Sequence, residues 1–139
     1  SLGRSVDDLR NRWLRLEKWF DQVEALPCDV DWFDLDASGR PVHCGLSAKK
    51  ARSRWNILGA VVVRNGNERP EDVNTKRRVS EMPLLDMAVL VKGVQLLVEE
   101  RQRVLRGKIH IVHEAAAEFD NAIGSLDIDL PELGHREGA

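Results

Sequence analysis

Apolar side chains recur along the first 26 residues at the spacing of an amphipathic helix. They are Val6, Leu9, Trp13, Leu16, Phe20 and Val23, separated by alternating steps of three and four residues. Such a stripe covers one face of a helix and packs against a partner. Ser5 stands where an N-cap residue belongs, and Pro27 interrupts the pattern. The sequence therefore predicts a helix from Val6 to Leu26.

The period changes between Pro27 and Gly45. Val30 and Trp32 alternate with acidic residues, and the turn-forming residues 36–39 follow. This pattern predicts two short strands joined by a glycine turn. Because Pro41 has no N–H to donate, we expect the second strand to be an edge strand or poorly formed.

Helical spacing returns after Ser47, the expected N-cap of a second helix. Its apolar positions are Ala48, Ala51, Trp55, Leu58 and Val62. The helix is expected to end at Asn65-Gly66-Asn67. Residues 64–79 contain Pro70 and few apolar side chains, which predicts a basic mobile loop.

A third helix is expected to start near Ser80, and its apolar stripe is the longest of the three. The stripe comprises Leu84, Met87, Val91, Val94, Val98, Leu105, Ile109, Val112, Ala116, Phe119 and Ile123. Either one long, kinked helix runs through Gly107, or two helices fold back there. A helical hairpin would need a very tight turn at residues 106–108, so we favour the continuous or kinked helix. Two shorter helices cannot cover so long a stripe, so we predict self-association through it.

Together these elements predict a mainly α fold: a helical bundle of two shorter helices and one long C-terminal helix, with a small β-hairpin between the first two. One helical domain spans 1–139, with the hairpin insert at 27–45, the basic loop at 64–79 and an acidic tail at 125–139. The hydrophobic fraction of 42% and the charged fraction of 32% exclude a disordered chain.

Charge is unevenly distributed although the net charge is only −2. Residues 46–78 carry nine basic and three acidic side chains, and residues 107–139 carry two and seven. The basic segment predicts a nucleic-acid-binding patch as one alternative. Its residues would be Lys49, Lys50, Arg52, Arg54, Lys76, Arg77 and Arg78. The other interpretations are a solvated surface, the commoner meaning of a charge run, or a docking site for the acidic tail.

The most apolar run, Leu84 to Val98, is interrupted by Asp86, Lys92 and Gln95. It is too short and too polar for a membrane-spanning helix, so no membrane partner is expected. The N-terminal residues do not form a secretory signal, and two cysteines allow at most one disulfide. These features favour a cytoplasmic location.

Few residues of the sequence are candidates for binding a metal or a cofactor. The available soft ligands are Cys28, His43, Cys44, His110, His113 and His135. No paired C-x-x-C is present, and adjacent strand residues point to opposite faces, so we predict no metal site and no cofactor. Residues 34–39 match the first half of a calcium loop, but its twelfth position is Gly45 instead of a glutamate. Turn chemistry explains this segment.

Arg103 followed by His110 resembles the arginine and histidine spacing of HEPN-type ribonucleases, which are also helical. The resemblance covers only this pair, and many helices contain such a pair by chance. A helical ribonuclease is therefore the third interpretation. No phosphate loop, nucleophile elbow or dinucleotide fingerprint occurs in the sequence, which favours a protein that is not an enzyme.

The leading functional prediction is a non-enzymatic helical accessory or scaffold subunit, acting through protein–protein association and forming a homo-oligomer through its long helix. Nucleic-acid binding is the alternative. Aromatic and apolar positions near the seams predict the association surface. They are Trp19, Trp32, Val91, Val98, Leu105 and Val112.

Overall fold

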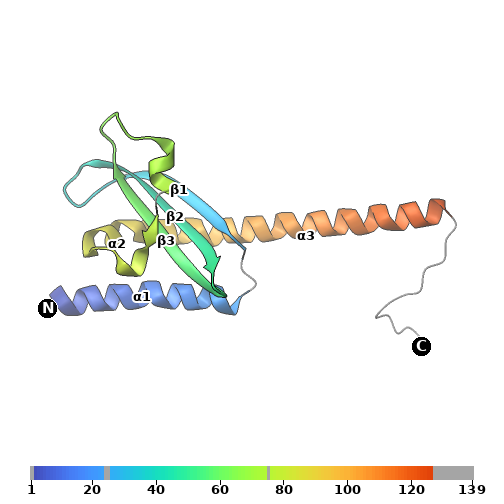
Figure 1. Cartoon of the computed structure of the whole chain (residues 1–139), viewed down its shortest axis with the longest axis horizontal. Coiled ribbons are helices and arrows are strands. Elements are labelled where there is room, and N and C mark those ends of the chain that lie inside the picture. The colour runs from blue at the N-terminus through green and yellow to red at the C-terminus, as the bar shows by residue number, and fades with distance from the viewer. Residues whose placement is uncertain (1, 24–25, 75, 127–139) are drawn as a thin grey trace. The chain divides into compact units, whose positions relative to one another are not determined.

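An antiparallel sheet with helices packed on one face makes up most of the computed structural model, which describes residues 2–23, 26–74 and 76–126 (Figure 1). The elements in chain order are α1 (Leu2–Gln22), β1 (Cys28–Leu35), β2 (Pro41–Ala51), β3 (Arg54–Val63), η1 (Pro70–Asn74), β4 (Arg77–Arg78), η2 (Val79–Glu81), α2 (Leu84–Leu90), η3 (Val91–Gly93) and α3 (Val94–Ser125). The strands lie in the order β1-β2-β3-β4. The chain divides into two units, residues 1–105 and 106–139.

The prediction of a mainly α helical bundle is wrong, because the segment expected to form the second helix belongs to the sheet. β2 and β3 pair from Val42 opposite Val63 to Ala51 opposite Arg54. The steps of three and four residues in this segment coincide with a helical pattern. Its β-branched run at 61–63 fits a pleated sheet better than a helix.

The turn between β2 and β3 carries no recognisable signature in the sequence. Arg52 and Ser53 both have positive φ, at 53° and 69°. This is the combination that two-residue hairpin turns favour, but they usually achieve it with Asn-Gly or Asp-Gly. Ser47, the expected helix N-cap, instead lies within β2, where its hydroxyl donates to the Asp29 carboxylate.

β2 is a central strand, so the expectation of an edge strand beginning near Pro41 is also wrong. Pro41 is the first residue of β2, a position that tolerates the missing N–H. The segment predicted as a loop at 64–79 contains η1 and β4. At Gly45 a Cβ would lie 2.5 Å from Val73 Cγ1, so η1 lies directly against the sheet there.

The core lies between the sheet and the helices. Alternate β2 side chains from Val42 to Ala48 are fully buried on one face, as the period of two in a strand requires. They pack in one cluster with Phe20 of α1, Leu90 of α2 and Leu97 of α3. Burial of each large side chain in this cluster contributes about 1.5–3 kcal/mol.

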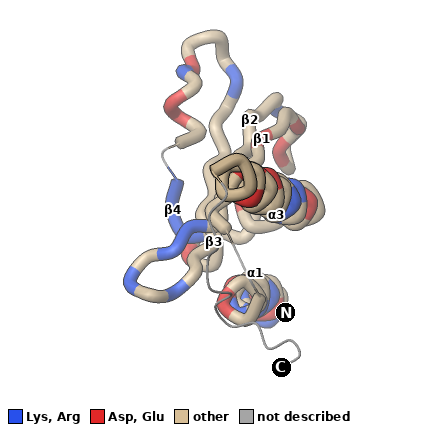
Figure 2. Tube along the Cα trace, turned by 90° about the vertical axis from the view of Figure 1, so that its right-hand side faces the viewer, with Lys and Arg blue, Asp and Glu red and all other residues tan. Residues whose placement is uncertain are grey.

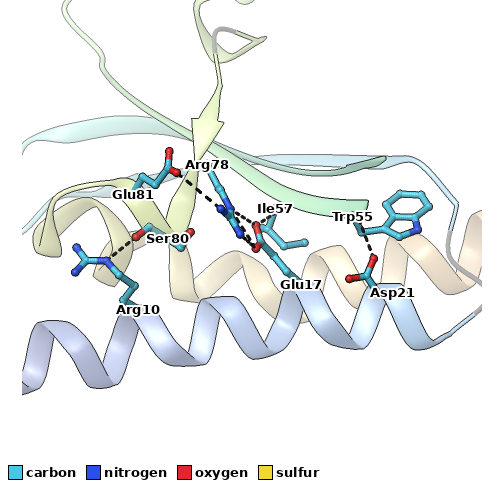
Figure 3. Close-up of polar contacts among 8 residues, drawn as sticks. All are labelled: Arg10, Glu17, Asp21, Trp55, Ile57, Arg78, Ser80 and Glu81. Carbon is cyan, nitrogen blue, oxygen red and sulfur yellow. Dashed lines mark hydrogen bonds and ion pairs between the residues drawn. The ribbon is translucent and has the colours of Figure 1, made fainter. Parts of the chain in front are cut away.

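Helix α1 runs beside β3 and supplies hydrogen-bond acceptors to that strand (Figure 3). Glu17 Oε2 accepts the Ile57 N–H at 3.0 Å, and Asp21 Oδ1 accepts the Trp55 N–H at 2.9 Å. Glu17 and Asp21, four residues apart on one helix face, thus accept the two β3 N–H groups that a neighbouring strand would otherwise bind. The helix begins at Leu2 and ends at Gln22, so the predicted boundaries, including an N-cap at Ser5, are wrong.

The predicted third helix is interrupted near Gly93, not at Gly107. Residues 79–93 form η2, α2 and η3, and α3 then continues from Val94 through Gly107 to Ser125. A Cβ at Gly93 would overlap the indole ring of Trp32, whereas nothing lies within 4 Å of the corresponding position at Gly107. Close packing of β1 against η3 therefore requires glycine at 93.

None of the helices in the described ranges is long and apolar enough to cross a membrane. Most of the acidic tail predicted at 125–139 lies outside the described residues.

Candidate functional site

The second unit of the chain carries an exposed apolar stripe along α3. Its members recur at steps of three and four residues, as in a heptad repeat. They are Ile109, Val112, Ala116, Phe119, Ile123 and Leu126. Val112 is 64% exposed and Phe119 57%. We call this surface the α3 stripe; five of its six members are exposed, and Ile123 is half-buried.

The two flanks of the α3 stripe differ in charge. With 3.6 residues per turn, Arg106, His113 and Asp120 follow one another along one flank. The other flank begins with Lys108 and continues with alanines. Ile111 is as exposed as Val112, at 64%, but lies outside the stripe. The charged flank changes from basic to acidic along the helix, which gives the surface a direction.

The predicted association residues lie in different environments. Trp19 is half-buried, edge-on to Phe20 with centroids 5.1 Å apart, and the Trp32 ring packs against Gly93. These two tryptophans therefore serve the fold. The remaining predicted positions are Val91, Val98, Leu105 and Val112, of which Val98 and Leu105 are half-buried and Val91 is exposed on η3. Val112 alone among the six belongs to the α3 stripe.

Arg103 and His110, the pair that resembles a ribonuclease signature, each have an acidic neighbour on the same helix. Arg103 donates to both oxygens of Glu100 at 2.7 and 2.6 Å, which raises the pKa of Arg103 and lowers that of Glu100. His110 Nε2 lies 3.1 Å from Glu114 Oε1. These are i,i+3 and i,i+4 pairs of the kind common on helix surfaces.

The predicted basic residues are distributed over a hairpin and a short strand. Lys49, Lys50, Arg52 and Arg54 flank or form the β2–β3 turn and are exposed. Arg77 and Arg78 form β4, which pairs with Gly59 and Leu58. Figure 2 shows the Lys and Arg positions of β4 and of the hairpin at the same edge of the sheet.

Two of these seven cations, Lys76 and Arg78, are held by hydrogen-bond acceptors on neighbouring elements. Arg78 donates to Glu17, with Nη2 to Oε1 at 2.6 Å and Nε to Oε2 at 3.0 Å. Glu17 raises the pKa of Arg78 through these hydrogen bonds. Lys76 Nζ donates to Ser47 Oγ and lies 3.2 Å from Asp29 Oδ1. Burial raises the pKa of Asp29, but the hydrogen bonds from Ser47 and Lys76 outweigh it and lower the pKa overall.

A cleft of about 530 Å³ lies between α1 and the β3 edge, next to the basic hairpin. Its basic lining residues are Arg15, Lys18, Arg54 and Arg78, accompanied by Asn11, Leu14, Glu17, Asp21, Trp55 and Asn56. Arg15 and Lys18 lie 39 and 36 residues before Arg54 in the sequence. The sequence pattern does not indicate them, because only the pairing of α1 with β3 brings them to Arg54.

The candidate metal ligands do not converge. Within the described ranges, no group of three or more histidine, cysteine or acidic side chains could hold a metal ion. Cys28 and Cys44 are buried free thiols, and burial raises both pKa values to about 11. His43 lies on the sheet face opposite to Cys44, and its Nε2 is 2.7 Å from Asp31 Oδ2. His113 is exposed on α3, and His135 lies outside the described residues.

The half-match to a calcium loop is a hairpin turn. Asp36 Oδ1 accepts the N–H groups of Ser38 and Arg40 at 3.0 and 2.9 Å. The Arg40 N–H is the main cause of a pKa of about 2 for Asp36. The carboxylate oxygens of Asp36 therefore already accept hydrogen bonds within the turn.

Comparisons with known proteins leave the fold and these surfaces as the only guides to function: no family model, no curated protein and no solved structure matches the chain.

Proposed function

We propose that the protein is a non-enzymatic assembly subunit that pairs with a second copy of itself through the α3 stripe. The observation that supports this most strongly is the heptad-spaced apolar face over residues 109–126, in which five of the six members are exposed and Ile123 is half-buried. Isolated helices of this length are marginal in water, and most helical stability comes from packing of an apolar face. A second helix supplies that packing.

Burial of the stripe supplies the driving force for this dimer. Ile109, Val112, Phe119 and Ile123 are the large side chains of the stripe's centre. Burial of each from full exposure would contribute about 1.5–3 kcal/mol, and because they start about half exposed on average, their burial in both copies contributes roughly 6–12 kcal/mol. Association costs about 4–15 kcal/mol in lost freedom. At the upper end of that contribution and the low end of that cost, burial of the stripe supports an affinity of about 1 µM.

Charge along the flank favours an antiparallel pair. When two copies run in opposite directions, with Val112 beside Ala116 of the second copy, Arg106 of each faces Asp120 of the other. In a parallel pair, flanking positions of successive heptads meet, so Lys108 faces His113 and Asp120 faces an alanine. Only the antiparallel arrangement joins opposite charges.

The test of association is sedimentation equilibrium over about 1–100 µM protein, centred on the affinity expected from burial. Val112→Asp and Phe119→Asp place a charge in the seam, so both variants are expected to be monomers at concentrations where the wild type is a dimer. Ile111→Asp is the matched control, because Ile111 is equally exposed but outside the stripe. Circular dichroism verifies that every variant is folded.

A monomeric wild type at about 100 µM would contradict the proposal, as would an Ile111→Asp variant that dissociates as readily as Val112→Asp. Orientation is tested separately by exchanging charges. Arg106→Asp and Asp120→Arg should each weaken an antiparallel dimer, and the double variant should restore it. If the double variant is as weak as the single ones, the dimer is not antiparallel in this register.

A further inference from the structure

A second surface, within residues 1–105, gathers cations that lack partners. It consists of side chains from α1, the β2–β3 hairpin and β4 at one edge of the sheet. They are Arg15, Lys18, Lys50, Arg52, Arg54 and Arg77. All six are exposed, and none makes a side-chain hydrogen bond or ion pair with another residue of the described part of the chain. We call this surface the basic edge.

The two carboxylates that line the cleft, Glu17 and Asp21, offset only part of its positive charge, because four basic side chains line it with them. Glu17 is buried beneath Arg78 and also accepts the Ile57 N–H. Asp21 is oriented toward the Trp55 N–H (Figure 3). Both acids therefore stabilise the β3 edge. The cleft beside them retains Arg15, Lys18 and Arg54 as unpaired cations, with Asn11 and Asn56 as neutral hydrogen-bonding groups.

The dimensions of the basic edge match a duplex. Arg54 begins β3, and Arg77 pairs with Gly59 five residues further along that strand. At about 3.3 Å per residue, this separation is roughly 16 Å, or about half a turn of B-form DNA. Beyond Ala48, where β1 no longer pairs with β2, the β2–β3 hairpin is a two-stranded ribbon, and such a ribbon fits the major groove, which is about 12 Å wide.

The surface lacks the features that single-stranded nucleic acid requires. Binding of single strands depends on aromatic side chains on which bases stack. Trp55, the aromatic residue in the cleft, is buried against Phe20 in the core. Contacts from arginine and lysine to phosphates need no stacking platform.

We propose that the basic edge binds the phosphate backbone of duplex nucleic acid. Arg15, Lys18 and Arg54 contact phosphates from the cleft, while Lys50, Arg52 and Arg77 contact them from the hairpin and β4. Lys76 and Arg78 are excluded from this role, since Ser47, Asp29 and Glu17 already hold them. The site recognises duplex shape and charge, so binding is expected to be independent of sequence.

The test is fluorescence anisotropy of a labelled DNA duplex of about 20 base pairs, about two helical turns, titrated with the full chain. Six phosphate contacts predict a loss of about 10³-fold in affinity between about 50 and 200 mM salt. The variant Arg52→Asn/Arg54→Gln removes two contacts, so the log–log salt slope should decrease by about 2. Asparagine at 52 accommodates the positive φ of that residue.

The matched control is Arg12→Gln/Arg69→Gln, which removes two exposed, unpaired cations outside the basic edge. It is expected to bind with the wild-type slope, and the dimer measured by sedimentation is expected to persist in both variants. Absence of binding at about 100 µM protein in low salt would overturn the proposal. Equal loss in the control, or binding to anionic phospholipid vesicles without binding to duplex, would also overturn it.

Discussion

Replacement of Glu17 by alanine is the sharpest test of how α1 is attached to the sheet. The Glu17 side chain is only 6% exposed, and its carboxylate accepts the Ile57 N–H and two donors of Arg78 (Figure 3). The substitution removes all three acceptor contacts. It leaves the Ile57 N–H unsatisfied beside the core.

The magnitude follows from these contacts. A hydrogen bond to a charged group contributes about 1.5–3 kcal/mol, and a buried donor left without a partner costs about 1–3 kcal/mol. The Arg78 side chain is 38% exposed, so water compensates part of its loss. We therefore expect Glu17→Ala to lower the free energy of unfolding by about 2–4 kcal/mol. Glu17→Gln retains one acceptor oxygen and should lose about 1–2 kcal/mol.

Urea unfolding followed by tryptophan fluorescence measures this difference, because Trp13 and Trp55 are buried in the core. Glu81→Gln is the matched control. Glu81 lies 3.8 Å from Arg78, but its side chain is 69% exposed, so it should lose at most about 1 kcal/mol. If Glu17→Ala were no more destabilising than Glu81→Gln, α1 would not be anchored through its carboxylates.

Three further predictions concern packing, thiols and pH. Gly93→Ala should destabilise the protein by about 1–3 kcal/mol because its Cβ overlaps Trp32, whereas Gly107→Ala, which has open space around it and lies outside the unit of residues 1–105, should leave the urea midpoint of that unit unchanged; a Gly93→Ala midpoint at or above that of Gly107→Ala would refute this. Cys28 and Cys44, both with a pKa of about 11, should react with a thiol reagent at pH 8 only after denaturation, and rapid labelling of the native protein would contradict their burial. The lowered pKa of Asp29 stabilises the fold above the ordinary carboxyl pKa of 3.8, and this contribution is lost as pH falls through the folded pKa. The urea midpoint of Asp29→Asn should therefore approach that of the wild type at pH 2, and a constant difference from pH 7 to pH 2 would contradict the shift.

Sequence periodicity locates the first helix and the first hairpin but assigns the wrong structure to residues 48–62. The α1 stripe is unambiguous because its steps persist over five turns and end near a proline. Ala48 to Val62 satisfies the same spacing rule while forming two strands. Two small alanines contributed to that apparent stripe, and alanine carries little information about burial. A turn built from Arg52 and Ser53 offers no sequence signal, because these residues rarely adopt positive φ.

The two candidate surfaces were predictable to different extents. The α3 stripe is visible in the sequence as a heptad pattern, although the pattern does not show which residues are covered. The basic edge was only partly visible, since Arg15 and Lys18 join it through tertiary structure. Conversely, Lys76 and Arg78 appeared available in the sequence but are engaged by Ser47, Asp29 and Glu17.

The same apolar periodicity has two different consequences on either side of residue 105. Leu97 is fully buried in the core cluster, so the early turns of α3 are already stabilised by the sheet. Val98 in these turns is half-buried, whereas Val112 and Phe119, two and three heptads further along the same face, are exposed. Apolar side chains at these positions contribute nothing to the core of residues 1–105, yet they expose a contiguous patch to water. Substitutions at 112 and 119 should therefore leave the urea stability of that core unchanged and alter only association, which separates an assembly surface from a folding one.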